Sequence, residues 1–199
     1  MKKCTFILLV IFLYTAAAGQ DNSNELLKSV QSKYNSLNTL SVNFTKYSGS
    51  KQDFSGKLFL RKENKLRIEL KNNTIVTDGN TFWNYNKKEN KVIINNYDPS
   101  EPSELSLNTF INVYPSESNI SSGEEGNYKT LTLKPKTSDL NFNSAKLYLN
   151  VDDLIEKVEI DSNSGNAVIT FSGYNLNPEI PDSEFTYSPP KGIKVIDLR

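Results

Sequence analysis

Few side chains in this sequence are suited to catalysis. The chain has no histidine, which removes the most common general base, the most common metal ligand and any Ser–His nucleophile pair. Its nine glycines form neither a P-loop nor a G-x-G-x-x-G loop for phosphate. Carboxylates can work as acid–base pairs, but the 23 present are scattered as on a solvated surface. We therefore expect a binding protein rather than an enzyme, with no catalytic residue, metal or cofactor.

The first 19 residues have the layout of a secretory signal peptide. Two lysines precede an apolar run that ends in the small residues TAAAG. The run is short for a bilayer span of roughly 20 residues, which favours cleavage over an uncleaved anchor. Cys4 lies before the apolar run, where it is not placed to receive a lipid. We expect a cleavable signal peptide at 1–19 and one soluble, cysteine-free domain at 20–199.

The charge of the expected mature chain argues against two classes of partner. Without residues 1–19, it keeps 21 basic and 23 acidic side chains, a net charge of −2. Proteins that bind nucleic acid or anionic headgroups through their electrostatic field carry a basic surface. We therefore expect neither nucleic acid nor anionic lipid headgroups as a partner.

Hydrophobic periodicity predicts one helix followed by many strands. Residues 21–40 predict a helix, capped by Asn22 or Ser23, with Glu25 in its first turn and apolar side chains at helical spacing. Alternation with period two then predicts strands at 40–47, 54–62, 65–71, 90–97, 127–135, 144–152, 154–162 and 167–175, and a short one near the C-terminus. The short turns between the strands of residues 54–97 predict an antiparallel meander there.

The stretch NNTIVTDGNTFWNYN, residues 72–86, predicts a hairpin. A type I′ turn at Asp78-Gly79 would place Ile75 opposite Phe82 on one face. The other face would carry Val76, Trp83 and Tyr85. Because a surface hairpin usually has one polar face, the second apolar face needs a partner.

Residues 99–119 form a different kind of segment, bracketed by three prolines. The segment predicts one or two short helices that share one apolar face, formed by Leu105, Leu107, Phe110, Ile111 and Tyr114. Such helices are either part of the core or a movable cover, and the residues alone leave both open. With ten or eleven strands, the sheet must curl, and the few helices would cover the open end of the curled sheet. Whether side chains fill the interior or a cavity remains is also left open.

Three stretches carry a resemblance to a known family: FSGKLFLRKENKLRIEL, IVTDGNTFWNYN and FTYSPPKGIKVIDLR. In order, spacing and total length, the chain resembles the periplasmic outer-membrane lipoprotein carrier proteins of the LolA type. The resemblance implies a mainly β (α+β) fold, an incomplete antiparallel β-barrel with a short helical lid that encloses a hydrophobic cavity.

The resemblance also implies a function and partners. Members of the family accept acylated lipoproteins from an inner-membrane ABC transporter and carry them across the periplasm to an outer-membrane lipoprotein receptor. That receptor is lipid-anchored, and the lack of a cysteine at the expected cleavage site favours the soluble carrier. We expect a monomer. The alternatives are a lipoprotein-binding envelope sensor, which usually has a second domain, and a carrier of another lipid.

Alternation along the strands suggests which side chains would line the cavity of such a carrier. The expected set is Leu58, Leu60, Leu66, Ile68, Trp83, Tyr85, Leu147 and Leu149, with Phe110 and Ile111 on the lid. In the family an Arg-Pro pair follows the strand that corresponds to residues 54–62, and its arginine latches the lid by hydrogen bonding. Here Lys62-Glu63 stands at that place, so the expected latch is Lys62, whose amine lacks a planar fork, or Arg61 beside it.

Overall fold

The computed structural model describes residues 22–99 and 106–199 and contains one curled sheet. Its strands are β1 (Thr39–Ser48), β2 (Lys51–Arg61), β3 (Lys65–Leu70), β4 (Asn73–Asp78), β5 (Thr81–Asn86), β6 (Lys91–Asn96), β7 (Ser118–Glu125), β8 (Tyr128–Pro135), β9 (Ser144–Leu149), β10 (Ile155–Asp161), β11 (Ala167–Leu176) and β12 (Lys194–Asp197). The helical elements are α1 (Ser23–Ser36), the π-helical turn η1 (Thr109–Val113), α2 (Tyr114–Ser116) and the 3-10 turn η2 (Asp182–Phe185). The expected signal peptide lies outside the described residues.

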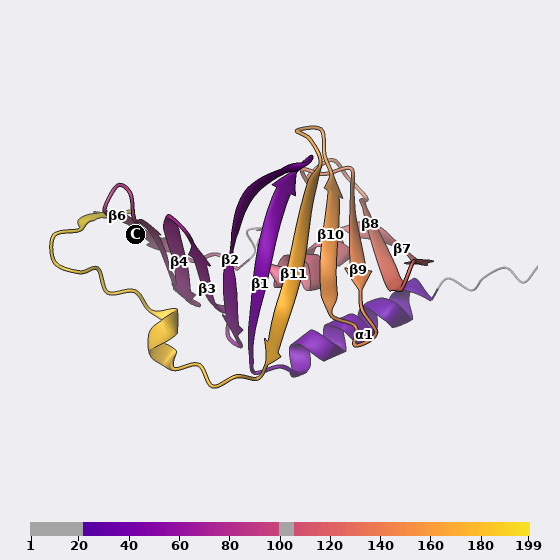
Figure 1. Cartoon of the computed structure of the whole chain (residues 1–199), viewed down its shortest axis with the longest axis horizontal. Helices are drawn as coiled ribbons and strands as arrows, with labels where there is room; N and C mark the ends of the chain where they lie inside the picture. Colours follow the sequence, from indigo (N-terminus) through magenta and orange to yellow (C-terminus); the bar gives the residue numbers. More distant parts are fainter. Residues whose placement is uncertain (1–21, 100–105) are drawn as a thin grey trace, which may run out of the picture.

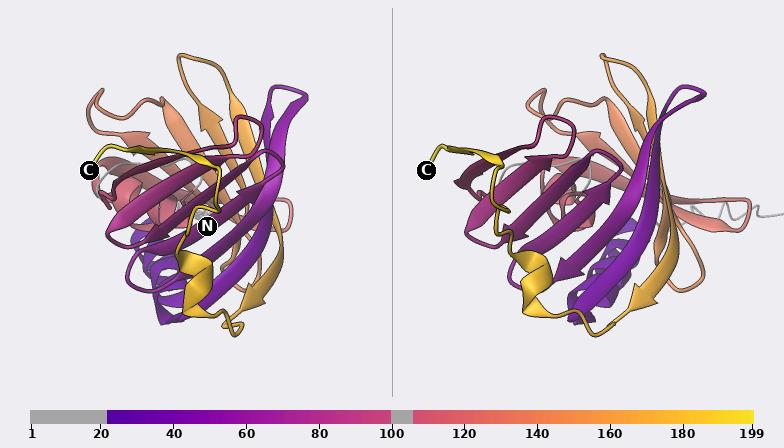
Figure 2. Two further views of the ribbon diagram at one scale, coloured as in Figure 1. Left: turned by 90° about the vertical axis from the view of Figure 1, so that its left-hand side faces the viewer. Right: turned by 60° about the vertical axis from the view of Figure 1, so that its left-hand side comes forward.

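The sheet is an incomplete barrel with two wings. Its order is β12-β6-β5-β4-β3-β2-β1-β11-β10-β9-β8-β7, so β12 and β7 are its edges. Figure 1 shows β7–β11 on one side of β1 and β2–β6 on the other, and Figure 2 shows the wings curling toward each other around α1. The predicted mainly β, half-barrel architecture is confirmed. The predicted antiparallel meander is confirmed for β2–β6. Strands β7–β11 form a second meander that joins the first through the pairing of β11 with β1, and β12 pairs with β6 in parallel.

Helix α1 packs its apolar stripe against the concave face of the sheet. Leu27 and Val30 are buried there, and Glu25 lies in the first turn, as predicted. Asn22 occupies the N-cap position, as predicted, but makes no side-chain capping hydrogen bond. No helix among residues 22–99 and 106–199 is long and apolar enough to cross a membrane.

The hairpin of β4 and β5 has the predicted faces but a different register. Val76 pairs with Trp83, and Thr77 rather than Ile75 pairs with Phe82. The turn is centred on Gly79, with φ +97°, and Asn80, because the Asp78 carboxylate accepts hydrogen bonds from the backbone N–H groups of Asn80 and Thr81. A positive φ at the first central position only is the type II′ pattern rather than type I′. The turn therefore lies one residue further along the chain than predicted, where the Asp78 carboxylate stabilises it.

One strand, β7, was absent from the prediction. Its sequence SNISSGEE is poor in β-branched and aromatic residues, so propensity favours no strand here. Eight consecutive pairs with β8 nevertheless hold it in the sheet. The predicted lid region contains η1 and α2, while Leu105 lies outside the described residues.

The C-terminal segment, residues 178–193, lies on the second apolar face of the hairpin. Figure 2 shows this segment running over the outer face of the β2–β6 wing. Phe185 in η2 is fully buried there, and Tyr187 stacks on Tyr85 with ring centroids 5.3 Å apart. Val76 and Val92, which point to the same outer face, are also fully buried. The chain therefore has a second, smaller core on the convex side of the sheet.

Candidate functional site

The concave face of the sheet carries apolar side chains in rows that cross the strands. Strand pairing aligns one row over seven strands: Val42, Leu58, Ile68, Ile75, Asn84, Ile93 and Ile196. A second row runs beside it: Leu40, Leu60, Leu66, Thr77, Phe82 and Asn95. In the first row, burial is nearly complete up to Ile68 and becomes partial from Ile75 onward. The hollow is therefore covered near β1 and more open toward β12.

Residues 107–116, here named the cover segment, fill the covered part of the hollow. Phe110 is fully buried, and Leu107 and Ile111 expose 1% each. The Phe110 ring meets Tyr114 edge-on at 5.5 Å, and Tyr114 contacts Phe142 at 4.8 Å. These side chains belong to the same apolar cluster as Leu58 and Ile68 of the sheet. The cover segment thus occupies space that apolar cargo would need.

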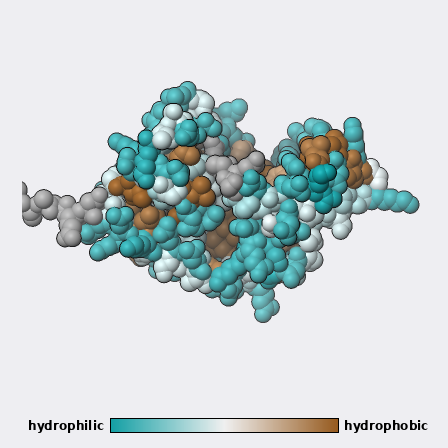
Figure 3. Space-filling view, turned by 180° about the vertical axis from the view of Figure 1, so that it is seen from behind, coloured by the Kyte–Doolittle hydropathy of each residue, from teal (hydrophilic) through white to brown (hydrophobic). Residues whose placement is uncertain are grey.

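A cavity of about 280 Å³ lies at the mouth of the hollow, beside the cover segment. Its apolar lining comes from Leu37, Leu40, Leu60, Leu66, Leu107 and Ile111. Figure 3, which views this side of the molecule from behind, shows apolar atoms recessed among polar ones. Small-molecule sites in proteins usually measure about 300–1,000 Å³, so this cavity is just below that range.

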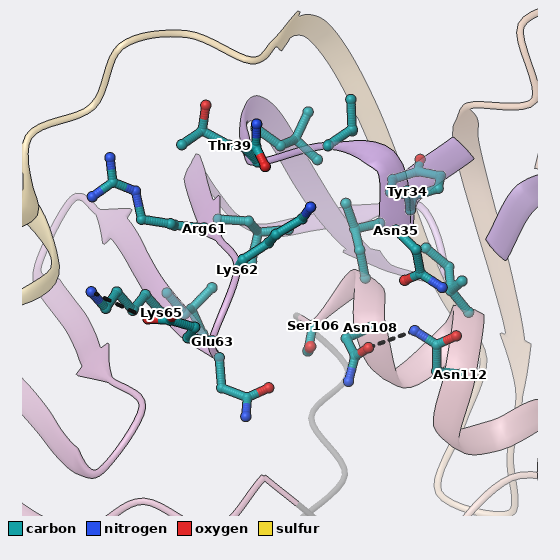
Figure 4. A pocket seen from close by; sticks show the side chains of 18 of the residues that line it. Tyr34, Asn35, Thr39, Arg61, Lys62, Glu63, Lys65, Ser106, Asn108 and Asn112 are labelled. Carbon is teal, nitrogen blue, oxygen red and sulfur yellow. Dashed lines mark hydrogen bonds and ion pairs between the residues drawn. The ribbon is translucent and has the colours of Figure 1, made fainter. Parts of the chain in front are cut away.

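The rim of this cavity is polar. Asn112 donates a hydrogen bond from Nδ2 to Oδ1 of Asn108 at 2.7 Å, within the cover segment (Figure 4). Lys65 lies opposite and pairs with Glu63 at 3.8 Å. Amide and ammonium groups around an apolar floor suit an amphipathic ligand, whose polar end would stay at the rim.

The two candidates for a lid latch point in different directions. Arg61 donates to the backbone oxygen of Ile180 at 2.6 Å and forms an ion pair with Asp182. Both partners belong to the C-terminal segment, residues 178–193. Its guanidinium also lies 5.5 Å from the ring centroid of Phe185. Both residues border the cavity, but Figure 4 shows the Lys62 amine directed across its mouth, away from Arg61. Arg61 therefore fastens the C-terminal segment, which sequence reasoning did not foresee.

The residues expected to line one cavity fall into three groups. Leu60, Leu66 and Ile111 line the cavity at the mouth. The others on the concave side are packed in the core below: Leu58, Ile68, Phe110, Leu147 and Leu149. Trp83 and Tyr85 pair with Val76 and Thr74 and so point to the convex face. The interpretation that these two aromatic residues face the hollow is corrected: both lie on the convex face, where Tyr187 of the C-terminal segment stacks on Tyr85.

Sequence reasoning overlooked Leu40, Leu37 and Ile75 as part of the hollow. Leu40 and Leu37 line the cavity, and Ile75 continues the row of Ile68. Alternation alone placed Ile75 and Trp83 on opposite faces but did not say which face was concave. Strand β3 decides which face Ile75 shares. Its clean alternation puts Ile68 on the apolar face, and Ile75 lies on the same face because it is the direct cross-strand partner of Ile68.

Helix α1 is fastened to the sheet by a ring of hydrogen bonds. The N–H of Ile155 donates to the Tyr34 hydroxyl at 3.0 Å, and the Tyr174 hydroxyl donates to the backbone oxygen of Ile155 at 2.6 Å. The two hydroxyls are 3.0 Å apart, so Tyr34 donates to Tyr174. Burial raises the pKa of Tyr34 to about 12, although its hydrogen bonds oppose the shift, and burial also raises the pKa of Tyr174. Both phenols stay protonated at neutral pH.

The described residues offer no metal centre. No group of three or more Cys, Asp or Glu side chains placed to hold a metal ion occurs in residues 22–99 and 106–199. The site within that part of the chain is thus defined by its apolar hollow, cover segment and polar rim.

Comparisons with known proteins agree with this geometry. The family described as "Outer membrane lipoprotein carrier protein LolA" matches residues 35–188. The outer-membrane lipoprotein carrier protein of Legionella pneumophila (strain Corby) is 26% identical over 205 residues, covering 98% of this chain and 99% of that protein. The protein of the same name from Pseudomonas putida (strain GB-1) is 26% identical, covering 94% of each.

Among solved structures, an uncharacterized conserved protein from Thermus thermophilus has a similar fold. It superposes with a TM-score of 0.63 at 12% sequence identity, covering 88% of this chain and 99% of that one. Such low identity speaks for the fold alone. The family match extends over most of the chain, including β1–β11, the cover segment and η2, and this chain belongs to the LolA family of outer membrane lipoprotein carrier proteins.

Proposed function

We propose that this protein is a periplasmic carrier that binds the acyl chains of lipoproteins and moves them from the inner to the outer membrane. The observation that carries the proposal is the apolar hollow of the sheet, closed by a cover segment whose own apolar side chains fill it. The family membership supports the same role. In this proposal an inner-membrane ABC transporter loads the carrier, an outer-membrane receptor unloads it, and the carrier acts as a monomer without catalysis.

The proposed acyl-binding surface follows the depth of the hollow. Leu60, Leu66 and Ile111 would meet the cargo first because they line the existing cavity. Leu58, Ile68 and the side of the cover segment that carries Phe110 would follow once the segment moves outward. The deeply buried Leu147 and Leu149 would form the floor.

Magnitudes indicate why such a carrier can release its cargo. Transfer of one sixteen-carbon acyl chain from water contributes roughly 12 kcal/mol, at about 0.8 kcal/mol per CH₂. Displacing Leu107, Phe110 and Ile111 from the core removes up to roughly 5–9 kcal/mol of burial, at about 1.5–3 kcal/mol for each side chain. Self-closure therefore offsets a large part of the gain from the first chain. A carrier built this way binds acyl chains reversibly rather than permanently.

Native mass spectrometry of the protein purified from periplasm tests the proposal. A co-purifying acylated polypeptide is the expected result. Free lipid without polypeptide would identify a carrier of another lipid and contradict the lipoprotein role. An empty protein that also fails to extract a lipoprotein from spheroplasts would contradict both.

A further inference from the structure

One hydrogen bond joins the middle of α1 to the cover segment. Gln31 donates from Nε2 to the backbone oxygen of Ile111 at 3.0 Å, in a partly buried position. Ile111 is both a wall of the cavity and part of the apolar core. The contact therefore acts at the point where the cover segment closes over the hollow.

The sequence of the cover segment explains why this carbonyl needs a partner from outside. In an α-helix the backbone oxygen of Ile111 would accept from the residue four positions later, which is Pro115. Proline has no N–H, so the carbonyl loses its helical donor. The chain here widens into the π-helical turn η1, in which Tyr114 donates to Thr109. Gln31 supplies a side-chain donor to this carbonyl, which Pro115 cannot supply.

Gln31 sits on the best-anchored stretch of α1. Two residues before it, Ser29 donates to Asp153, which also pairs with Lys129 at 2.8 Å. Three residues after it, Tyr34 belongs to the hydrogen-bond ring with Tyr174 and Ile155. Both contacts tie α1 to the sheet. Gln31 thus extends from a fixed support toward the cover segment.

The far end of the cover segment is held separately. Lys136 donates from Nζ to the backbone oxygen of Ser116 at 2.9 Å. The backbone N–H of Lys136 donates to the backbone oxygen of Glu117, also at 2.9 Å. These bonds fix the C-terminal end of the segment to the end of β8. The opposite end, at Leu107, borders the cavity. An outward movement would accordingly start at Leu107 and turn about Ser116.

We propose that Gln31 is the latch that holds the cover segment closed, and that release of its bond to Ile111 lets the segment open from the Leu107 end. The role falls to Gln31 because Arg61 fastens the C-terminal segment and Lys62 reaches into the cavity mouth. The inference rests on the proposed carrier function for its purpose, but its physical content concerns the opening of the segment itself.

Amide hydrogen exchange on the mature chain without cargo tests the latch. Gln31→Met keeps length and volume but removes the donor, and Gln31→Glu also places a carboxylate against the carbonyl. We expect amides of residues 109–116 to exchange roughly three- to tenfold faster in the Met variant, and at least as fast in the Glu variant. Gln31→Lys retains a donor of similar reach and should stay near wild type. Gln52→Met, at an exposed site on β2, is the matched control.

The β9 amides of residues 145–149 separate a latch from general destabilisation. Their exchange should stay unchanged in all variants. Equal exchange of residues 109–116 in wild type and Gln31→Met would overturn the inference, as would a parallel rise in β9.

A second readout separates the latch from the carrier function. A fluorescent sixteen-carbon fatty acid should enter Gln31→Met faster by the same factor. If wild-type protein takes up no fatty acid, the carrier function fails while the exchange data still decide the role of Gln31.

Discussion

The hydroxyl groups of Tyr34 on α1 and Tyr174 on β11 lie 3.0 Å apart and complete a ring through the backbone N–H and C=O of Ile155. Ile155 lies beyond the end of the β10–β11 ladder, which begins at the pair Lys157 and Thr170. Its polar groups on that side therefore lack a strand partner, and the two phenols replace one. The ring makes α1 a fixed wall of the hollow and leaves the cover segment as the part that can move.

Removal of one phenol should weaken this wall and change its response to alkali. Tyr174→Phe leaves the Ile155 carbonyl and the Tyr34 hydroxyl short of a partner, which should lower the free energy of unfolding by about 1–3 kcal/mol at pH 7. Urea denaturation followed by circular dichroism measures the loss. Tyr47→Phe on β1, outside the ring, should change stability by less than about 0.5 kcal/mol.

The pH dependence has a definite sign. Because the pKa of Tyr34 is raised to about 12 and that of Tyr174 is also raised, the folded protein keeps protons that the unfolded chain loses near pH 10. Their contribution is fully present below pH 10 and is lost as the pH rises through about 12. Tyr174→Phe should flatten the decline of stability between these values. Equal slopes in the variant and the wild type would contradict this assignment.

Trp83 should report on the C-terminal segment rather than on cargo. It is the only tryptophan of the chain and points to the convex face, with Val76 and the half-covered ring of Tyr85 beside it. Phe185→Leu should loosen the segment and shift Trp83 emission to longer wavelength, since water gains access to that face. A sixteen-carbon fatty acid should leave the emission maximum nearly unchanged. A ligand-induced shift as large as that of the variant would place cargo on the convex face.

The fold was predictable to the extent that local patterns determine it. Alternation in β3 identified Leu66 and Ile68 on one face, and the helical stripe of α1 identified Leu27 and Val30 as buried. Strand β7 was not predictable, because its polar sequence becomes a strand only through its pairing with β8. Long-range pairing overrode local propensity there.

The candidate site was only partly predictable because alternation assigns a face without saying what covers it. Both faces of the hairpin are apolar, and the sequence does not show that residues 178–193 return to the convex face, where Tyr187 stacks on Tyr85. The role of Arg61 has the same cause, since its partners Ile180 and Asp182 lie about 120 positions away. Contacts between distant segments are decided by tertiary packing.

Arg61 and Lys62 should differ sharply in their contribution to stability. Arg61→Ala removes the hydrogen bond to the Ile180 oxygen and the contact with the Phe185 ring, and should cost about 1–3 kcal/mol. The ion pair with the largely exposed Asp182 adds less than about 1 kcal/mol. Lys62→Ala should stay within about 0.5 kcal/mol, as an exposed substitution. Thermal unfolding together with limited proteolysis of residues 178–193 distinguishes them, and equal effects would contradict the assignment.

Leu66→Glu should separate folding from acyl binding. Leu66 lines the cavity and is only half-buried, so a carboxylate there can remain hydrated while it makes the apolar wall polar. Ile68→Glu and Leu149→Glu are poor tests, because both side chains are almost fully buried and an unpaired charge at either site would destabilise the fold. We expect Leu66→Glu to unfold within about 1 kcal/mol of wild type while its fatty-acid affinity falls at least tenfold. Leu198→Glu, at an exposed site on the C-terminal edge, is the charge-matched control and should bind normally. Normal binding by Leu66→Glu would show that the hollow behind this mouth is not where acyl chains enter.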